Sequence, residues 1–408
     1  MDLMQPASAQ FDGMQFFSTA HRAGAAYEIA DQSGVDHIEA LDDWEIEVRK
    51  GSRIVVARGS AAADYEEARD LGLDAANRGL DMLSGRGLGD FRIVNALDGH
   101  VAWWVEGTRP VVRLRSVPTV PVAVAPVTVR GGTPIVRPPA VWHKSPRFFR
   151  RAQTTDDLFD AYRNLYLALE SLLGTIAPQQ TNAAGKPTEG EGVWVRRALT
   201  VAGGMVSPSV HAKSGEPAPV DALWNEFYRD RRSALFHAKS SRGHLLPHGS
   251  SQRQEVVDSL QPISGLYLSL LDKVAHLKRP GNFLFASGWR LMTESYKDCL
   301  RIVATDDPIP FDSSQVRINP SGGRLVTLQT AHSPTHDRPF ERSFLGVTAG
   351  TRLRLFSRVT RVCATADDAP LTAHIPEGAL SLPLVNRLEV LLTLRAENVG
   401  LPRTRFAS

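Results

Sequence analysis

The feature that most constrains the fold is an apolar stripe at helical spacing in residues 154–173, TTDDLFDAYRNLYLALESLL. Its apolar side chains recur every three or four positions, which is typical of a helix that buries one face. Thr154, three residues before Asp157, is typical of a helix cap, and Gly174 of a helix stop. The stripe consists of Phe159, Tyr162, Leu165, Tyr166, Leu169, Leu172 and Leu173.

Three more segments with helical periodicity follow the first. They are residues 194–201, 221–239 and 251–277, and Pro262 should kink the last of them. Four helices in this order predict a helical bundle over residues 150–278.

The third of these segments, DALWNEFYRDRRSALFHAK, carries an arginine and a histidine near its end. Arg232 and His237 stand in the spacing R-x4-H. Arginine clamps phosphate, and histidine moves protons near neutral pH, so the pair suits RNA cleavage without a metal ion. About one such spacing is expected by chance in a chain of this composition, so the motif gains its weight from the helical context.

The text YRNLYLALESLL in the first helix and RDRRSALFHAKS at the third resembles the HEPN family of four-helix domains, over residues 150–278. Many HEPN domains are metal-independent ribonucleases of bacterial defence, toxin–antitoxin or RNA-processing systems, and their R-x4–6-H motifs meet across a homodimer. The resemblance implies that Arg232 and His237 are catalytic, supported by Arg231, Ser233 and Lys239, and Arg231 could replace Arg232. It also implies RNA as substrate, a homodimer, and an antitoxin or other regulatory partner.

Helix geometry independently favours a site shared between two chains. Residues five apart on an ideal α-helix differ by about 140° around the axis, so Arg232 and His237 would not share a face. His237 must then lie at a fraying helix end or act with a second copy. Two alternatives remain. The pair is a solvated helix end whose histidine caps carbonyls, or the domain is a non-catalytic HEPN scaffold or sensor that binds a partner protein or a nucleotide.

Composition excludes several other classes of protein. No apolar run is long enough for a membrane helix, and MDLMQPASAQ lacks the pattern of a signal peptide. Cys299 and Cys363 suit a reducing cytoplasm and form no zinc-binding pattern. His332 and His336 have metal-like spacing, but Pro334 between them argues against a helical metal site. We therefore expect a cytoplasmic protein without metal or cofactor.

The basic stretch at residues 137–151, RPPAVWHKSPRFFRR, precedes the first helix. Its cations interleave with Trp142, Phe148 and Phe149, and it has no acidic residue. Positive charge with aromatic stacking is what single-stranded RNA binding requires. The alternative is a linker whose aromatic side chains dock onto the helical bundle. The candidate RNA-binding residues here are Lys144, Arg147, Arg150 and Arg151.

The two ends of the chain predict further domains. Residues 1–140 contain strand patterns, one helical pattern at 61–83 and a Pro- and Val-rich linker, which predicts an α+β domain. Residues 279–408 predict a β-rich domain. Its strand candidates are residues 281–289, 300–305, 324–330, 352–364 and 388–394. The predicted fold class is therefore multidomain α+β, with a central HEPN-like four-helix bundle between these two domains.

One strand pattern in the last third adds two candidates. Arg352 and Arg354 would share one face of the predicted strand at 352–364 and could bind RNA. An exposed sheet edge protected by charge is the alternative explanation.

Overall fold

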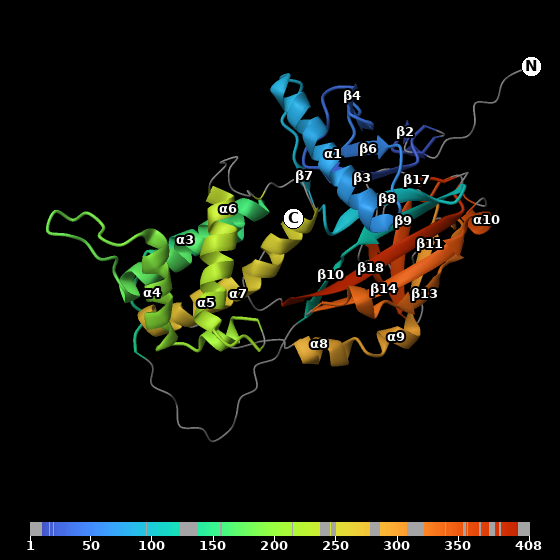
Figure 1. Ribbon diagram of the computed structural model, residues 1–408. Coiled ribbons are helices and arrows are strands. Elements are labelled where there is room, and N and C mark those ends of the chain that lie inside the picture. The colour runs from blue at the N-terminus through green and yellow to red at the C-terminus, as the bar shows by residue number, and fades with distance from the viewer. Residues whose placement is uncertain are drawn as a thin grey trace, which may run out of the picture. The chain divides into compact units, whose positions relative to one another are not determined.

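The computed structural model describes residues 10–122, 138–236, 250–277, 286–307, 322–353 and 356–398, apart from short gaps within these ranges, and Leu245. The candidates His237, Lys239 and Arg354 lie outside the described residues. The described chain forms two compact units (Figure 1). The first combines residues 10–122 with 286–398, and the second contains residues 138–236 and 251–277.

The first unit is built on an eleven-stranded mixed sheet. Its strand order is β13 (Gln329–His332), β14 (Glu341–Ala349), β18 (Arg387–Asn398), β9 (Arg109–Ser116), β8 (Gly99–Glu106), β3 (Ala23–Ile29), β6 (Ile54–Gly59), β5 (Trp44–Val48) and β4 (His37–Leu41). In addition, β7 (Ile93–Val94) pairs with β3, and β10 (Thr119–Val122) pairs with β18. Strand β18 runs parallel to β9 and antiparallel to β14, so it joins the early and late parts of the chain.

Both faces of this sheet are covered. Helix α1 (Tyr65–Gly85) lies across one face (Figure 1), where Gly79 allows close approach because a Cβ there would lie 2.7 Å from Ile46. A four-stranded sheet shares the core of the other face. Successive residues of a strand point to opposite faces, so Trp103 lies in this second core and Trp104 in the core under α1. The second sheet consists of β12 (Leu325–Thr327), β11 (Leu300–Thr305), β15 (Arg361–Ala366) and β16 (Ala369–His374).

Short elements complete the described part of the first unit. Strands β1 (Gln10–Phe11), β2 (Met14–Gln15) and β17 (Leu380–Ser381) form a small sheet. The helical ones are α8 (Ala286–Met292), α9 (Tyr296–Cys299), η3 (Pro334–His336) and α10 (Gly350–Leu353).

The second unit is helical. Its elements are α2 (Ser145–Thr154), α3 (Leu158–Ile176), α4 (Glu191–Gly203), η1 (Pro208–Val210), α5 (Pro219–Trp224), η2 (Asn225–Arg232), α6 (Ser233–Phe236) and α7 (Ser250–Ala275). The apolar stripe of α3 is buried as expected, but the cap is Asp157, whose carboxylate accepts the Asp160 N–H at 2.7 Å. Phe149 of α2 stacks on Tyr267 of α7 with ring centres 4.9 Å apart, so α2 belongs to this core.

The predicted fold class is wrong. The protein is a mixed α/β structure with a large eleven-stranded sheet, and a four-helix bundle is not its central core. Residues from the predicted domains 1–140 and 279–408 share that sheet through β18, a pairing that local sequence patterns do not reveal. The strands predicted at 281–289 and 352–364 are also incorrect in part, because α8 and α10 occupy described positions of these segments.

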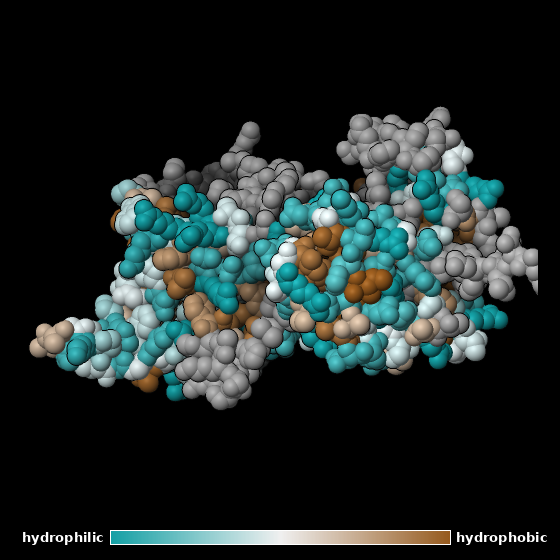
Figure 2. Space-filling model, turned by 90° about the horizontal axis from the view of Figure 1, so that it is seen from above, coloured by the Kyte–Doolittle hydropathy of each residue, from teal (hydrophilic) through white to brown (hydrophobic). Residues whose placement is uncertain are grey.

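Among the described residues, no helix combines the length and the apolar character that crossing a bilayer requires. The face in Figure 2 is mostly hydrophilic, and its hydrophobic side chains gather in small separate patches.

Candidate functional site

The segment that carries Arg232 is not the continuous α-helix that its periodicity predicts. Residues Asn225–Arg232 form a π-helix, and the Ser233 N–H donates to the carbonyl oxygen of Tyr228, five positions back. The Ser233 hydroxyl donates to the same oxygen at 3.1 Å. Ser233 therefore has a structural role in the described chain.

The Arg232 side chain is held in one orientation by three contacts. Its Nη2 lies 2.7 Å from Oε1 of Glu191 at the start of α4. Its guanidinium lies over the rings of Tyr228 and Phe236, at 5.5 and 5.3 Å from their centres. The side chain is 16% exposed, so its charge stays near the surface while its direction is fixed.

The neighbouring Arg231 points elsewhere. Its guanidinium pairs with Glu255 at 3.0 Å and donates to Ser259 at 3.2 Å, both on α7. Of the two arginines, it is therefore Arg232 whose partner belongs to the cavity described next.

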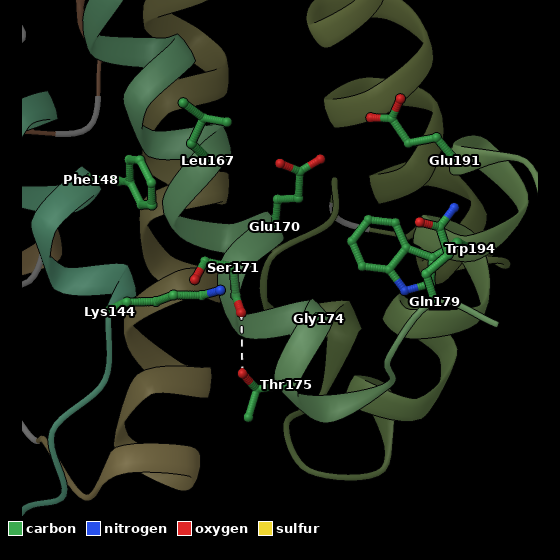
Figure 3. Close-up of a pocket in the computed structure, with 10 residues that line it drawn as sticks. All are labelled: Lys144, Phe148, Leu167, Glu170, Ser171, Gly174, Thr175, Gln179, Glu191 and Trp194. Atoms are coloured by element: carbon green, nitrogen blue, oxygen red, sulfur yellow. Dashed lines mark hydrogen bonds between the residues drawn. The ribbon is translucent and has the colours of Figure 1, made fainter. Parts of the chain in front are cut away.

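A cavity of about 700 Å³ lies among α2, α3 and α4 (Figure 3). Lys144, the N-cap residue of α2, and Phe148 of α2 form one wall, and Glu191 and Trp194 come from α4. The lining residues of α3 share one helical face because they are spaced three or four positions apart. In Figure 3, Glu170 points into the space between Phe148 on one side and Trp194 on the other. The lining residues are Lys144, Phe148, Leu167, Glu170, Ser171, Gly174, Thr175, Gln179, Glu191 and Trp194.

Two carboxylates and a tyrosine make this cavity electrostatically unusual. Burial raises the pKa of Glu170 above its ordinary value, and the negative charge of Glu191 raises it further. Arg232 acts in the opposite direction on the same carboxyl. The Tyr166 hydroxyl nearby is buried without a hydrogen-bond partner among the described residues, and burial raises its pKa. Buried polar groups of this kind cluster at functional sites.

The basic residues predicted to bind RNA extend this site along α2. Lys144, Arg147, Arg150 and Arg151 are all exposed, and within the described chain no carboxylate pairs with them. Residues 138–143 of the stretch are not helical, and helix α2 begins at Ser145. Of its aromatic side chains, Phe149 docks into the helical core, whereas Trp142 is 78% exposed.

The remaining RNA-binding candidates belong to the last third of the chain. Arg352 is exposed on α10, which belongs to the first unit, and Arg354 lies outside the described residues. The alternating strand face predicted for them is wrong, since residues 350–353 are helical. No group of three metal ligands occurs among the described residues, His332 and His336 included.

Sequence reasoning missed Glu170 and Glu191. A signal for Glu170 was present, because it is an acidic residue between the apolar residues Leu169 and Leu172 of the α3 stripe. Its closeness to Glu191 depends on how α3 and α4 pack, which no spacing along the chain reveals.

Comparison with protein-family models, with curated proteins and with solved structures found no match for this chain. The functional argument therefore depends on the site itself.

Proposed function

We propose that the helical unit is a metal-independent endoribonuclease of HEPN type that acts as a homodimer, with Arg232 and His237 as catalytic residues. The observation that carries the proposal is the fixed Arg232 guanidinium beside the cavity carboxylates, on a unit whose α2 is exposed and basic. Such an enzyme must meet two requirements. It needs cations that attract the RNA backbone, and it needs an arginine in a fixed orientation that can bind the reacting phosphate.

The chemistry needs no group beyond those of two chains. A histidine of one copy takes the proton of a ribose 2′-hydroxyl, whose oxygen attacks the adjacent phosphorus. The bond from phosphorus to the 5′-oxygen breaks, and the histidine of the other copy donates a proton to that oxygen. Arg232 stabilises the negative charge that develops on the phosphoryl oxygens, while Glu191 positions Arg232. The products are a 2′,3′-cyclic phosphate and a 5′-hydroxyl.

Substitution of the two catalytic candidates tests this proposal. We expect Arg232→Ala and His237→Ala to lower RNA cleavage at least about a hundredfold, as expected for loss of charge stabilisation or of a proton-transfer group. Arg229→Ala is the matched control, because Arg229 is exposed on the same π-helix and pairs with Asp230. Cleavage should persist in EDTA and spare DNA, which lacks the 2′-hydroxyl. Equal cleavage by the His237 variant and the parent would contradict the proposal.

One observation favours a second candidate function, a non-catalytic HEPN scaffold or sensor. The Arg232 charge already has a carboxylate partner and two aromatic neighbours, as a structural arginine would. A scaffold would cut no RNA, and Arg232→Ala would lower its stability or its binding of a partner. Mass measurement distinguishes the two further, because the composite active site requires a dimer at micromolar concentration or in the presence of RNA.

The proposed place of action is the cytoplasm, with an antitoxin or another regulatory protein as a partner. Cys299 and Cys363 are free, as a reducing compartment favours, and burial raises the pKa of Cys363 to about 12.

A further inference from the structure

We infer that the cavity between α2, α3 and α4 is a binding site for a guanine base of single-stranded RNA. The volume of about 700 Å³ falls within the range of small-molecule sites. The inference deepens the proposed function, on which it rests in taking RNA as the source of the base. Its test measures binding without cleavage, so the two can fail separately.

The walls of the cavity suit a flat ring. Phe148 and Trp194 lie on opposite sides of the space into which Glu170 points (Figure 3). Trp194 is fixed because its indole N–H donates to the Ala177 carbonyl oxygen at 2.7 Å. Stacking of a base on aromatic side chains is the usual way in which proteins hold unpaired nucleotides.

The polar group facing this space selects the base. An ionised carboxylate only accepts hydrogen bonds, and it has two oxygens side by side. Guanine presents two adjacent donors, N1–H and the N2 amino group, and therefore matches both oxygens of Glu170. Adenine and cytosine place an acceptor nitrogen beside their amino donor, and uracil has one imino donor between two carbonyls.

Arg232 already supplies a positive charge near Glu170, so a neutral hydrogen-bond donor can bind there. Glu191 is already paired with Arg232, and the raised pKa of Glu170 reflects burial before any charge effect. Two N–H donors from guanine would satisfy the carboxylate without placing a second buried charge beside it. At the same cavity, Lys144 is an exposed cation without a described carboxylate partner, and it can bind the phosphate group of the same nucleotide.

Calorimetric titration of the full-length protein with guanosine 3′-monophosphate tests the inference. We expect binding that adenosine 3′-monophosphate does not match, and a loss of about tenfold or more in affinity for Glu170→Gln, since an amide cannot accept both donors. Phe148→Leu should also weaken binding, through lost stacking. Glu216→Gln is the matched control, because Glu216 is an exposed carboxylate of the same unit that does not line the cavity. Circular dichroism checks that each variant is folded.

A second arm of the experiment identifies the source of the base. The RNA pentamer UUGUU should displace the mononucleotide, whereas UUAUU should not. Preference for adenosine, or affinity unchanged in Glu170→Gln, would overturn the guanine assignment. A pentamer that cannot displace the mononucleotide would overturn the assignment to RNA. Guanine binding without any RNA cleavage would leave the inference standing and reject the proposed nuclease.

Discussion

Glu170 is a carboxyl group that the helical packing holds away from water. Its pKa is raised, so the folded state favours the protonated form more than the unfolded chain does. The stability associated with that proton is fully present below the unfolded pKa of about 4.3 and is lost as the pH rises through the folded value. The residue therefore reduces stability near neutral pH.

Removal of the Glu170 charge should stabilise the helical unit near neutral pH. Glu170→Gln should raise the melting temperature of the helical unit by a few degrees at about pH 7, because it removes the desolvated charge at nearly constant volume. The difference between variant and parent should shrink as the pH falls towards about 4. Thermal melts across this pH series measure it. A variant less stable than the parent at neutral pH would show that Glu170 makes a net stabilising interaction.

At the scale of elements, the position of η2 against α4 determines where Arg232 points. The indole N–H of Trp224 donates to the Gly192 carbonyl oxygen at 2.8 Å, and a Cβ on Gly192 would lie 2.7 Å from the Tyr228 ring. The absent side chain of Gly192 thus admits Tyr228, over which Arg232 lies.

Alanine substitution of Gly192 should show that the cost of overpacking exceeds the gain in helix propensity. Gly192→Ala should destabilise the helical unit by about 1–3 kcal/mol, because the added methyl group overpacks the contact with Tyr228. Gly174→Ala is the matched control in the last turn of α3, where the new Cβ would be 3.8 Å from Trp194 and in ordinary contact. We expect that control to gain about 0.5–1 kcal/mol from alanine's better helix propensity. Urea unfolding followed by helical circular dichroism measures both.

Sequence patterns predicted individual elements better than their assembly. The predicted strand at 300–305 coincides with β11, because β-branched and apolar residues there are bounded by turn residues. Strand β3, AGAAYEI, was missed since alanine and glycine give no apolar alternation, although it is buried beneath α1. At the candidate site, Arg232 was selected from its motif and stays a prediction. The π-helix that directs it depends on contacts with α4, which no local pattern contains.

At the scale of the molecule, the two units have separate cores, and β18 belongs to the first. Val390 at the middle of β18 is 0% exposed and lies in the core between the two sheets. Val390→Asp places an unpaired charge there, which should unfold the first unit by removing several kcal/mol of stability. Helices α3 and α7 of the second unit should keep their protection in hydrogen exchange.

The matched control for this prediction is Ile38→Asp on the edge strand β4 of the same sheet. Ile38 is 54% exposed, so the charge stays in water and protection should be unchanged. Loss of protection in α3 and α7 together with that of α1 would mean that the two units unfold as one.

The parallel pairing of β18 with β9 has a consequence for how the chain is made. A ribosome completes β3, β6, β8 and β9 long before it reaches β18, so the edge of β9 that β18 will cover is open during most of synthesis. The helical unit, encoded between them, can acquire its own core in that interval. Translation order therefore favours a nascent chain in which the helical unit is already folded while the sheet still lacks its connecting strand.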